Sequence, residues 1–450
     1  MLNDDPDCLP PATAAADPAE RLNQGCFCIT LDRQALSREL DVEVGIPGFA
    51  SALAGSHPSL FSNVPVFVTR ATMAALEGVV AAVETAAGLP AYNAAAMARA
   101  PAIALADFGP VGALMGYDFH ITADGPRLIE INTNAGGAFL NNALAAAQRA
   151  CCREGQSLIG NIVPPRDFAA QITDMFTAEW RLQRGAGQPS TIAIVDDDPD
   201  GQFLLPEFQL ARAILQASGI RTVIADPAAL SFDGSTLWFD GHAIDLVYNR
   251  LVDFGLAEDR HAALRAAYES SKVIVSPNPH NHALLADKRN LMLLSDTETL
   301  ELWGLGAQHR KALDGAVPLT MIVNAANADA LWADRRNQFF KPASGHGSKA
   351  AYRGEKLTRK VWAEILGGSY VAQAYAPPSS RMIVHNGAPS AFKLDIRLYT
   401  YAGATLLAAA RLYQGQTTNM RTPGGGFAPV FEITGNGPVP PTAADRHHAY

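Results

Sequence analysis

The sequence of 450 residues lacks several features that would assign it to a membrane or a secretory route. It has no run of about eighteen apolar residues, so we expect no membrane-spanning helix. Residues 1–20 are acidic and rich in proline and alanine, without the basic and apolar segments of a signal peptide. The five cysteines form no C-x-x-C pair and have no partners at metal-ligand spacing, which favours reduced thiols. We therefore expect a cytoplasmic protein with a disordered leader over residues 1–20.

Positive charge is also in deficit. Lysine and arginine number 35 against 44 aspartates and glutamates, a formal net charge of −9, whereas nucleic-acid binders normally carry a basic stripe. This balance argues against a nucleic-acid partner, but a local cluster of cations can still bind a small anion. Hydrophobic residues make up 48% of the chain, and its length exceeds what one core usually serves, so two or three lobes are expected.

The pattern along the chain indicates an α/β protein in several parts. Residues 21–165 form an N-terminal region that is alanine-rich and helical in places. Residues 186–285 alternate strands with helices, which is typical of a βαβ unit and a small parallel sheet. Residues 286–435 become β-rich, with glycine-rich loops between the strands. A loose tail is expected over residues 436–450.

Individual elements can be placed within these parts. A turn at Asp124-Gly125 predicts a hairpin with strands near 117–122 and 127–132. Helices are expected near 71–87, 168–182, 206–218 and 356–366.

The predicted hairpin carries the first group of candidate residues. Glu130 and Asn132 are two apart and so share a face of their strand, and Asp118 can lie opposite them on the neighbouring strand. Two carboxylates and an amide oxygen form a hard-oxygen site suited to Mg²⁺ with bound phosphates. Asn134 and the glycines after it let the backbone turn beside the ligand. The alternative is an ordinary polar hairpin face with a turn of the Asx type.

The second group lies in FFKPASGHGSKAAYRG. A strand delivers Lys341, a point charge for nucleotide phosphates, into a glycine-rich loop over residues 344–349. Its backbone N–H groups can bind phosphate oxygens, and glycine permits close approach. The loop residues concerned are Ser344, Gly345, His346, Gly347 and Ser348. The alternative is a flexible surface loop.

The third group follows in LDIRLYTY and AARLYQGQTTNMRTPGGG. It places Arg397, Arg411 and Arg421 on or beside neighbouring strands, with Asn419 nearby. Guanidinium groups on a sheet suit the recognition of carboxylates or phosphates. The alternative is a solvated strand face.

The motifs occur together in an order that resembles a known family. K-P with a glycine-rich loop, then D-I-R, then R…N…R…GGG is similar to the nucleotide-binding part of ATP-grasp enzymes. D-F-x-x-T-x-D-G-P-x-x-I-E-I-N-T-N-x-G-G is similar to their metal-binding hairpin, which usually comes last but here comes first. This order resembles the circularly permuted ATP-grasp fold of glutathionylspermidine synthetases. The middle region resembles the small α/β domain that precedes the ATP-grasp lobes in glutathione synthetase-like ligases.

The resemblance implies a role for each matching residue. Asp118, Glu130 and Asn132 would hold one or two Mg²⁺ ions, with Mn²⁺ as an alternative. Lys288 and Lys341 would contact ATP, and the loop 344–349 would cover its phosphates. The strand ending in Gln373, Ala374 and Tyr375 would present backbone groups to the adenine, and Gln373 stands where many relatives have Glu. Gly116 stands where relatives carry an arginine, so Arg421, then Arg411 or Arg397, would stabilise the transition state.

The resemblance favours a carboxylate–amine ligase that forms an amide through an acyl-phosphate. An ATP-grasp kinase and a nucleotide-binding protein without turnover are the alternatives. The partners are expected to be a small carboxylate and a small amine, and Arg250 and Asn134 and Asn419 are candidate contacts for them. Arg250 ends the strand DLVYNR, near the crevice where open α/β sheets bind ligands, although a surface ion pair is equally compatible. The oligomeric state stays open, with a homodimer as one option.

Overall fold

The computed structural model describes residues 17–27, 29–150, 168–345, 350–385 and 387–433. Residues 1–16 of the expected leader and the expected tail 436–450 lie outside the described residues. Helix α1 (Pro18–Gly25) begins inside the expected leader, because the Asp17 side chain accepts a hydrogen bond from the Ala19 N–H and a proline opens the helix.

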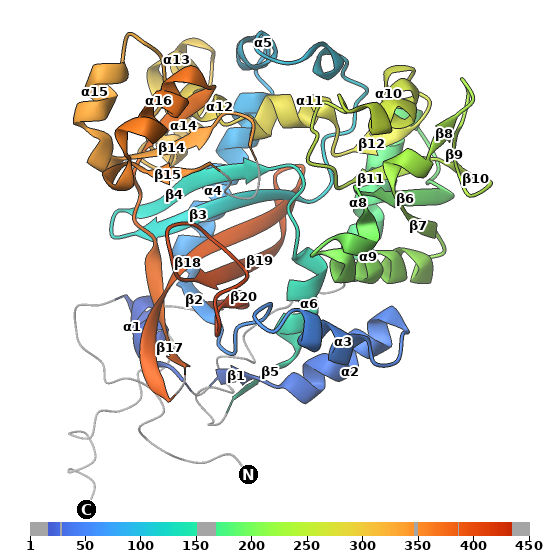
Figure 1. The fold of residues 1–450 in the computed structure, drawn as a ribbon, viewed down its shortest axis with the longest axis horizontal. Helices are drawn as coiled ribbons and strands as arrows, with labels where there is room; N and C mark the ends of the chain where they lie inside the picture. The colour runs from blue at the N-terminus through green and yellow to red at the C-terminus, as the bar shows by residue number, and fades with distance from the viewer. Residues whose placement is uncertain (1–16, 28, 151–167, 346–349, 386, 434–450) are drawn as a thin grey trace, which may run out of the picture.

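A seven-stranded sheet at the centre of the molecule joins both halves of the chain (Figure 1). Its strands run in the order β2, β20, β19, β18, β3, β4, and β17 also pairs with β18. Their bounds are β2 (Val66–Thr69), β3 (Met115–Thr122), β4 (Gly125–Asn132), β17 (Ser379–His385), β18 (Ala388–Tyr401), β19 (Ala404–Tyr413) and β20 (Gly426–Ile433). Within this sheet β2 and β20 run parallel, and the other paired strands run antiparallel.

The β3–β4 hairpin confirms the expected turn and lies beside a strand from far along the chain. Gly125 adopts a φ of 103°, which glycine tolerates, and Asp118 faces Glu130 across the hairpin. On its other edge β3 pairs with β18, where Asp118 lies opposite Arg397. The hairpin therefore precedes strands β17 to β20 of its sheet in the sequence, although circular permutation itself stays a prediction.

Helices cover both faces of this sheet. Helix α4 (Arg70–Ala87) is capped by Thr69 and buries Leu76, Val79, Val80 and Val83, a stripe at helical spacing. This stripe belongs to a core that also contains side chains of β3, β4, β18 and β19. Helix α6 (Ala138–Ala146) contacts β20 and β19 and belongs to a second core.

The middle region forms a four-stranded parallel sheet in the order β12, β11, β6, β7, as the βαβ pattern predicts. The strands are β6 (Thr191–Val195), β7 (Arg221–Ala225), β11 (Leu246–Asn249) and β12 (Ile274–Ser276), and the nearby helices are α8 (Phe168–Arg184), α9 (Leu205–Ala217) and α10 (Ala262–Glu269). All five residues of β6 are buried, which explains why its sequence is a nearly continuous run of apolar residues. The carboxyl ends of β6 and β11 lead into Asp196 and Arg250.

A smaller antiparallel sheet supplies the nucleotide-binding candidates. Its order is β13 (Thr320–Ile322), β16 (Tyr370–Ala374), β14 (Gln338–Pro342), β15 (Tyr352–Arg353). Helices α15 (Ala328–Ala333) and α16 (Arg359–Gly367) share a core with it, in which Trp362 contacts Phe340.

The remaining elements lie around these sheets. The strands are β1 (Ile29–Leu31), β5 (Gln148–Ala150), β8 (Ser231–Phe232), β9 (Leu237–Phe239) and β10 (His242–Ile244). The helices are α2 (Arg33–Val44), α3 (Phe49–Ser56), α5 (Pro90–Met97), α11 (Pro279–Asn281), α12 (Asn290–Leu294), α13 (Thr297–Leu302) and α14 (Ala307–Leu313).

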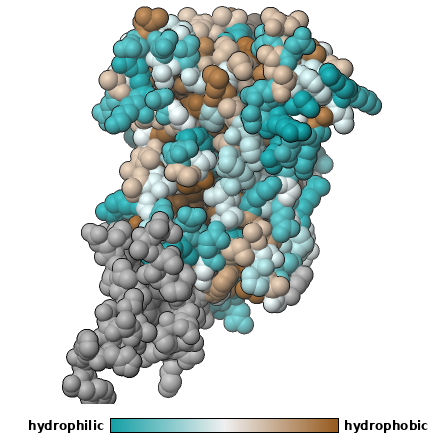
Figure 2. Space-filling view, turned by 90° about the vertical axis from the view of Figure 1, so that its left-hand side faces the viewer, coloured by the Kyte–Doolittle hydropathy of each residue, from teal (hydrophilic) through white to brown (hydrophobic). Residues whose placement is uncertain are grey.

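No single helix within the described ranges has the length and apolar content to cross a membrane. Helices α4 and α5 meet these two criteria only when they are counted together, and they are bent by 79° relative to each other. Hydrophilic residues cover most of the described surface on the face shown in Figure 2, with hydrophobic residues recessed among them.

One buried carboxylate links the parallel sheet to the hairpin. Glu207 on α9 is 1% exposed and accepts hydrogen bonds from the N–H groups of Gly137, Phe139 and Leu140 at 2.9, 3.2 and 3.1 Å. These N–H groups open α6 and have no partner within that helix. Glu207 therefore fixes the loop that follows β4 against the parallel sheet.

We predict that Glu207→Ala lowers the free energy of unfolding by about 2–4 kcal/mol, because three buried N–H groups lose their acceptor. Urea denaturation measures the loss. The matched control is Glu77→Ala on the exposed face of α4, which should change stability by less than about 0.5 kcal/mol. Equal effects of the two substitutions would contradict the linking role of Glu207.

Candidate active site

A cavity of about 540 Å³ lies where the three sheets meet. It is lined from the hairpin, from the ends of β6 and β11, from the small sheet, and from β18, β19 and the loop after β19. The candidate residues that line it are Asp118, Glu130, Asn132, Asn134, Arg250, Lys288, Lys341, Gly345, Gln373, Ala374, Tyr375, Arg397, Arg411 and Asn419. Residues from distant parts of the sequence thus share one cavity.

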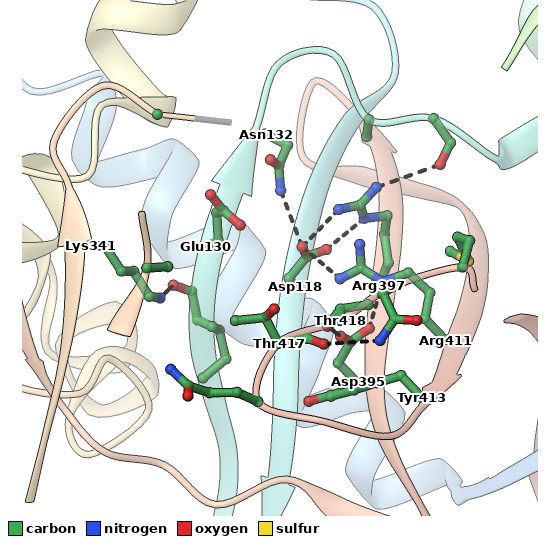
Figure 3. Close-up of a pocket in the computed structure, with 18 of the residues that line it drawn as sticks. Asp118, Glu130, Asn132, Lys341, Asp395, Arg397, Arg411, Tyr413, Thr417 and Thr418 are labelled. Carbon is green, nitrogen blue, oxygen red and sulfur yellow. Dashed lines mark hydrogen bonds and ion pairs between the residues drawn. The ribbon is translucent and has the colours of Figure 1, made fainter. Parts of the chain in front are cut away.

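Asp118 lies at the centre of a buried charge cluster (Figure 3). Arg397 donates from Nε to Oδ1 at 2.6 Å and from Nη2 to Oδ2 at 2.7 Å, and Arg411 Nη2 donates to Oδ2 at 2.8 Å. Arg411 Nε also donates to Asp395 Oδ1 at 2.7 Å. Burial opposes ionisation of Asp118, but the two guanidinium groups outweigh it and hold the pKa of this carboxyl well below its usual range.

Glu130 faces a different cation on the same hairpin. Lys288 Nζ lies 2.9 Å from Glu130 Oε1 and also donates to the Gly345 carbonyl at 2.6 Å. Burial would raise the pKa of Glu130, but Lys288 and Lys341 lower it below the ordinary value. Lys288 therefore bridges the hairpin and the start of the glycine-rich loop.

The donor set of the hairpin fits a divalent cation. Asp118 and Glu130 are both held ionised, and Asn132 Nδ2 lies 3.2 Å from Asp118 Oδ2. Asp118 Oδ1 accepts one bond, and Glu130 Oε2 accepts none from the described residues, so each keeps a lone pair for a cation. Carboxylate and amide oxygens are the ligands that Mg²⁺ prefers.

Lys341 on β14 is 6% exposed and reaches two acceptors. Its Nζ donates to the Ile129 carbonyl at 2.7 Å and to Gln373 Oε1 on β16 at 2.8 Å. Burial lowers the pKa of Lys341 to about 8, partly offset by Glu130. The N–H groups of Ala374 and Tyr375 donate to the carbonyls of Leu319 and Asn337, so neither is available to a ligand in this structure.

Arg250 is 4% exposed and is no surface residue. Its guanidinium donates from Nη2 to the Asn134 carbonyl at 2.8 Å and from Nη1 to the Ala135 carbonyl at 3.3 Å. The alternative of a surface ion pair is therefore wrong. The group lies where the parallel sheet meets the loop after β4, within the lining of the cavity.

Several expected contacts have a different position or lie outside the described residues. Arg421 is exposed and is absent from the cavity lining, in contrast to the buried Arg397 and the half-buried Arg411. Ser344 is exposed beside the cavity without lining it. The residues His346, Gly347 and Ser348 lie outside the described residues. Asn419 lines the cavity, but its amide supports its own loop by donating to the Gln414 carbonyl at 3.0 Å.

Gly116 on β3 packs closely against the loop after β4. A Cβ at this position would lie 2.4 Å from the Ala135 Cβ and 3.4 Å from Arg397 Nε. Ala135 therefore leaves no room for a side chain at residue 116, and Arg397 of β18 lies at contact distance beside it.

The sequence did not single out Asp395 or His120, which both line the cavity. Asp395 is 3% exposed and holds Arg411, and the Thr418 hydroxyl donates to its other oxygen. The sequence signal that could have identified Asp395 is its position two residues before Arg397, which places both side chains on the same face of β18. His120 Nδ1 donates to the Ala376 carbonyl at 2.7 Å, and burial lowers the pKa of this histidine. Asp196 lines the cavity beyond Arg250, and burial raises its pKa to about 6.

We predict that nucleotide affinity falls as pH rises through about 8, because the pKa of Lys341 lies there and only the charged form attracts phosphate. Below that pH the ammonium is present, and above it the site loses one cation, which costs about tenfold in affinity. Calorimetric titration with ATP from about pH 7 to about 10 measures the change. Lys341→Arg keeps its charge over this range and should flatten the profile. An unchanged decline in that variant would assign the effect to another group.

Comparisons with known proteins concern the fold. No model of a protein family and no curated protein matches the sequence. A glutathione synthetase-like effector from Globodera pallida is 12% identical, covers 89% of this chain and 98% of its own, and superposes with a TM-score of 0.56. A proposed gamma-glutamylcysteine synthetase from Methylobacillus flagellatus KT is 13% identical over 79% of this chain and 85% of its own, with a TM-score of 0.45.

The ATP-grasp ligase PsnB, solved with its precursor peptide PsnA2 and AMPPNP, is 14% identical over 54% of this chain and 88% of its own, with a TM-score of 0.29. At these identities the likeness concerns architecture, and the effector alone of the three superposes above 0.5. The predicted fold class is confirmed: over most of its length this chain has the ATP-grasp fold in the form shared with the glutathione synthetase-like effector.

Proposed function

We propose that this protein is a Mg²⁺- and ATP-dependent carboxylate–amine ligase. The observation that carries the proposal is the meeting of two ionised carboxylates with four cations around one cavity: Lys288, Lys341 and Arg397, which are buried, and Arg411, which is half-buried. Cations around a metal site on an ATP-grasp scaffold suit phosphoryl transfer, in which positioning and charge neutralisation supply most of the rate enhancement.

The reaction would proceed in two steps. A substrate carboxylate oxygen attacks the γ-phosphorus of ATP, and the bond to the β–γ bridging oxygen breaks, releasing ADP. The nitrogen of an amine then attacks the carbonyl carbon of the acyl-phosphate, phosphate leaves, and the nitrogen loses its proton. The name of the structural neighbour, glutathione synthetase-like effector, is compatible with amide formation.

In the proposed complex Lys288 and Lys341 neutralise the nucleotide phosphates from the two sides of the hairpin end. Lys288 also contacts Gly345, so the glycine-rich loop is anchored to the same cation. The base would lie beside Gln373, Ala374 and Tyr375. Because two N–H groups of this strand are engaged, side chains and carbonyls would make the polar contacts with the base.

Asp118, Glu130 and Asn132 would hold one or two Mg²⁺ ions, or Mn²⁺ in their place. The metal, when bound, would supply positive charge that offsets the negative charge of the nucleotide phosphates. Asp118 has a second task, because it orients Arg397 and Arg411 through three short hydrogen bonds. Held in this way, the two guanidinium groups would stabilise negative charge on the transferring phosphoryl group.

Arg250 would bind the carboxylate of a substrate. Its side chain lines the cavity on the far side of the loop 134–137 from Arg397, whose Nη1 lies 3.5 Å from the Gly136 carbonyl. The substrate carboxylate and the transferring phosphoryl group would then each face a guanidinium group that contacts the loop 134–137.

The direct test is ADP release with ATP, Mg²⁺ and a pool of small carboxylates, with hydroxylamine present to trap an acyl-phosphate as hydroxamate. We predict hydroxamate formation in step with ADP, reduced on the order of 10²–10³-fold in Asp118→Asn and Glu130→Gln. The matched control is Asp124→Asn in the exposed turn of the same hairpin, which should keep its rate.

Each other outcome contradicts part of the proposal. ADP release without hydroxamate would indicate a kinase. Failure to bind Mg·ATP in a calorimetric titration would contradict the proposed nucleotide site as a whole.

The three candidate arginines can be ranked in the same assay. We predict that Arg397→Lys and Arg411→Lys lower the turnover number by about 10²-fold, because lysine keeps the charge but loses the forked geometry. Arg421→Ala, at an exposed position, should cause a smaller loss. A larger loss in Arg421→Ala would assign the transition-state role to that residue.

A further inference from the structure

The carboxyl ends of two neighbouring strands of the parallel sheet carry side chains of opposite charge. Asp196 follows β6 and Arg250 follows β11, and these strands are paired up to Val195 and Asn249. The two charged residues are buried, at 9% and 4% exposure, and both line the cavity. Their own hydrogen bonds go elsewhere, so no ion pair joins them within the described part of the chain. Open α/β sheets bind their ligands at this end of the strands.

Arg250 keeps one edge of its guanidinium group without an acceptor. Its Nη1 donates to the Ala135 carbonyl and the Tyr248 hydroxyl, and one N–H of Nη2 donates to the Asn134 carbonyl. The buried Nε has no partner among the described residues, and neither has the second N–H of Nη2. Nε and Nη2 form an edge of the planar fork that can pair with a carboxylate through two parallel hydrogen bonds. Buried polar groups without partners are rare in folded proteins, so this free edge points to a ligand.

Asp196 offers the complementary charge and keeps one oxygen for a ligand. Its Oδ1 accepts from the Asp197 N–H at 2.9 Å, whereas its Oδ2 accepts no hydrogen bond from the described residues. Burial raises the pKa of this carboxyl to about 6, although the charge of Arg250 opposes the shift. A buried carboxylate with so few partners is stabilised by any cation that binds beside it.

The residue after Asp196 fixes the position of this carboxylate. Asp197 Oδ1 lies 2.9 Å from His261 Nε2 and 3.1 Å from Arg260 Nε. Arg260 also pairs with Asp226, which follows β7. These contacts hold the connection between β6 and α9, so Asp196 is in place before a ligand arrives.

The surroundings of the two charges favour a ligand that carries both opposite charges. Apolar side chains line the cavity beside them, namely Phe203, Leu204, Phe208 and Val252. A simple carboxylate bound to Arg250 would leave Asp196 without a counter-ion, and a simple amine bound to Asp196 would leave the free edge of Arg250 unpaired. An α-amino acid carries a carboxylate and an ammonium group on one carbon and can pair with both residues at once.

We propose that the substrate held by Arg250 is an α-amino acid, whose carboxylate pairs with the Nε–Nη2 edge of Arg250 and whose ammonium group pairs with Asp196. The inference rests on the proposed function, in which Arg250 binds the carboxylate of a substrate, and deepens it by naming the class of that substrate. Asp196 is then the residue that distinguishes an amino acid from other small acids.

The test measures binding by calorimetry in the presence of Mg²⁺ and the ATP analogue AMPPNP. Each common α-amino acid is titrated in both enantiomeric forms, and at least one should bind with a Kd below about 1 mM. For that amino acid two matched analogues are compared, the acid that lacks the amino group and the amine that lacks the carboxylate. Each analogue should bind at least about tenfold more weakly, because one of the two buried charges stays unpaired.

Asp196→Asn separates recognition of the ammonium group from a general effect on the cavity. The substitution keeps an acceptor for the Asp197 N–H but removes the charge. It should weaken binding of the amino acid by at least about tenfold and leave binding of AMPPNP and of the acid without an amino group unchanged. The matched control is Asp200→Asn, at an exposed position in the same connection, which should change none of the three affinities. Thermal unfolding without ligands checks that both variants are folded.

The outcomes separate this inference from the proposed function. Binding of AMPPNP without binding of any of these amino acids, or equal affinity for the amino acid and either analogue, would overturn the inference and leave the proposed nucleotide site intact. A preference for the amino acid that Asp196→Asn leaves unchanged would overturn it as well. Failure of AMPPNP to bind the unmodified protein would instead contradict the proposed function, on which the inference depends.

Discussion

A single buried carboxylate, Asp118, accepts hydrogen bonds from the guanidinium groups of the buried Arg397 and the half-buried Arg411, and the arrangement of the cavity depends on these contacts. Removing ions from water is costly, and only close pairing and full hydrogen bonding offset that cost. Arg411 is shared with Asp395, which in turn accepts from Thr418 of the loop after β19. Strands β3, β18 and β19 and that loop are thus joined through charged groups as well as through backbone ladders.

The same cluster sets the electrostatic character of the site. Three buried or half-buried carboxylates, Asp118, Glu130 and Asp395, face four cations, Lys288, Lys341, Arg397 and Arg411. The local balance is positive although the whole chain carries a net charge of −9. The cavity would therefore attract an anionic ligand. A divalent cation that binds beside Asp118 and Glu130 would enter together with such an anion.

Much of this arrangement was accessible from the sequence, because local patterns determined it. The period of two in the hairpin placed Glu130 and Asn132 on one face, and the turn at Asp124-Gly125 set Asp118 opposite them. The alternation of strands with helices over residues 186–285 predicted the parallel sheet. The glycine-rich loop could be named in the sequence, but most of it lies outside the described residues.

What the sequence could not supply were contacts between distant strands. The pairing of β3 with β18 put Arg397 against Asp118, and nothing local separates this arginine from the exposed Arg421. Glu207 reads as an ordinary charged residue of an amphipathic helix, yet it holds the start of α6. The unpartnered Nε of Arg250 became visible only once the carbonyls of Asn134 and Ala135 were placed beside its other nitrogens.

The β3–β18 pairing has a consequence for how the protein is made. Residues 123–387 separate the two strands, so at about 5–20 residues per second a ribosome needs roughly 13–53 s to supply the second after the first. During that interval the nascent hairpin has Asp118 without either arginine and one edge of β3 without its neighbour. Both are features that favour contact with chaperones or wrong strand partners. Faithful biogenesis of this protein therefore depends on keeping an acidic, half-paired hairpin apart from other chains until β18, which begins at residue 388, emerges.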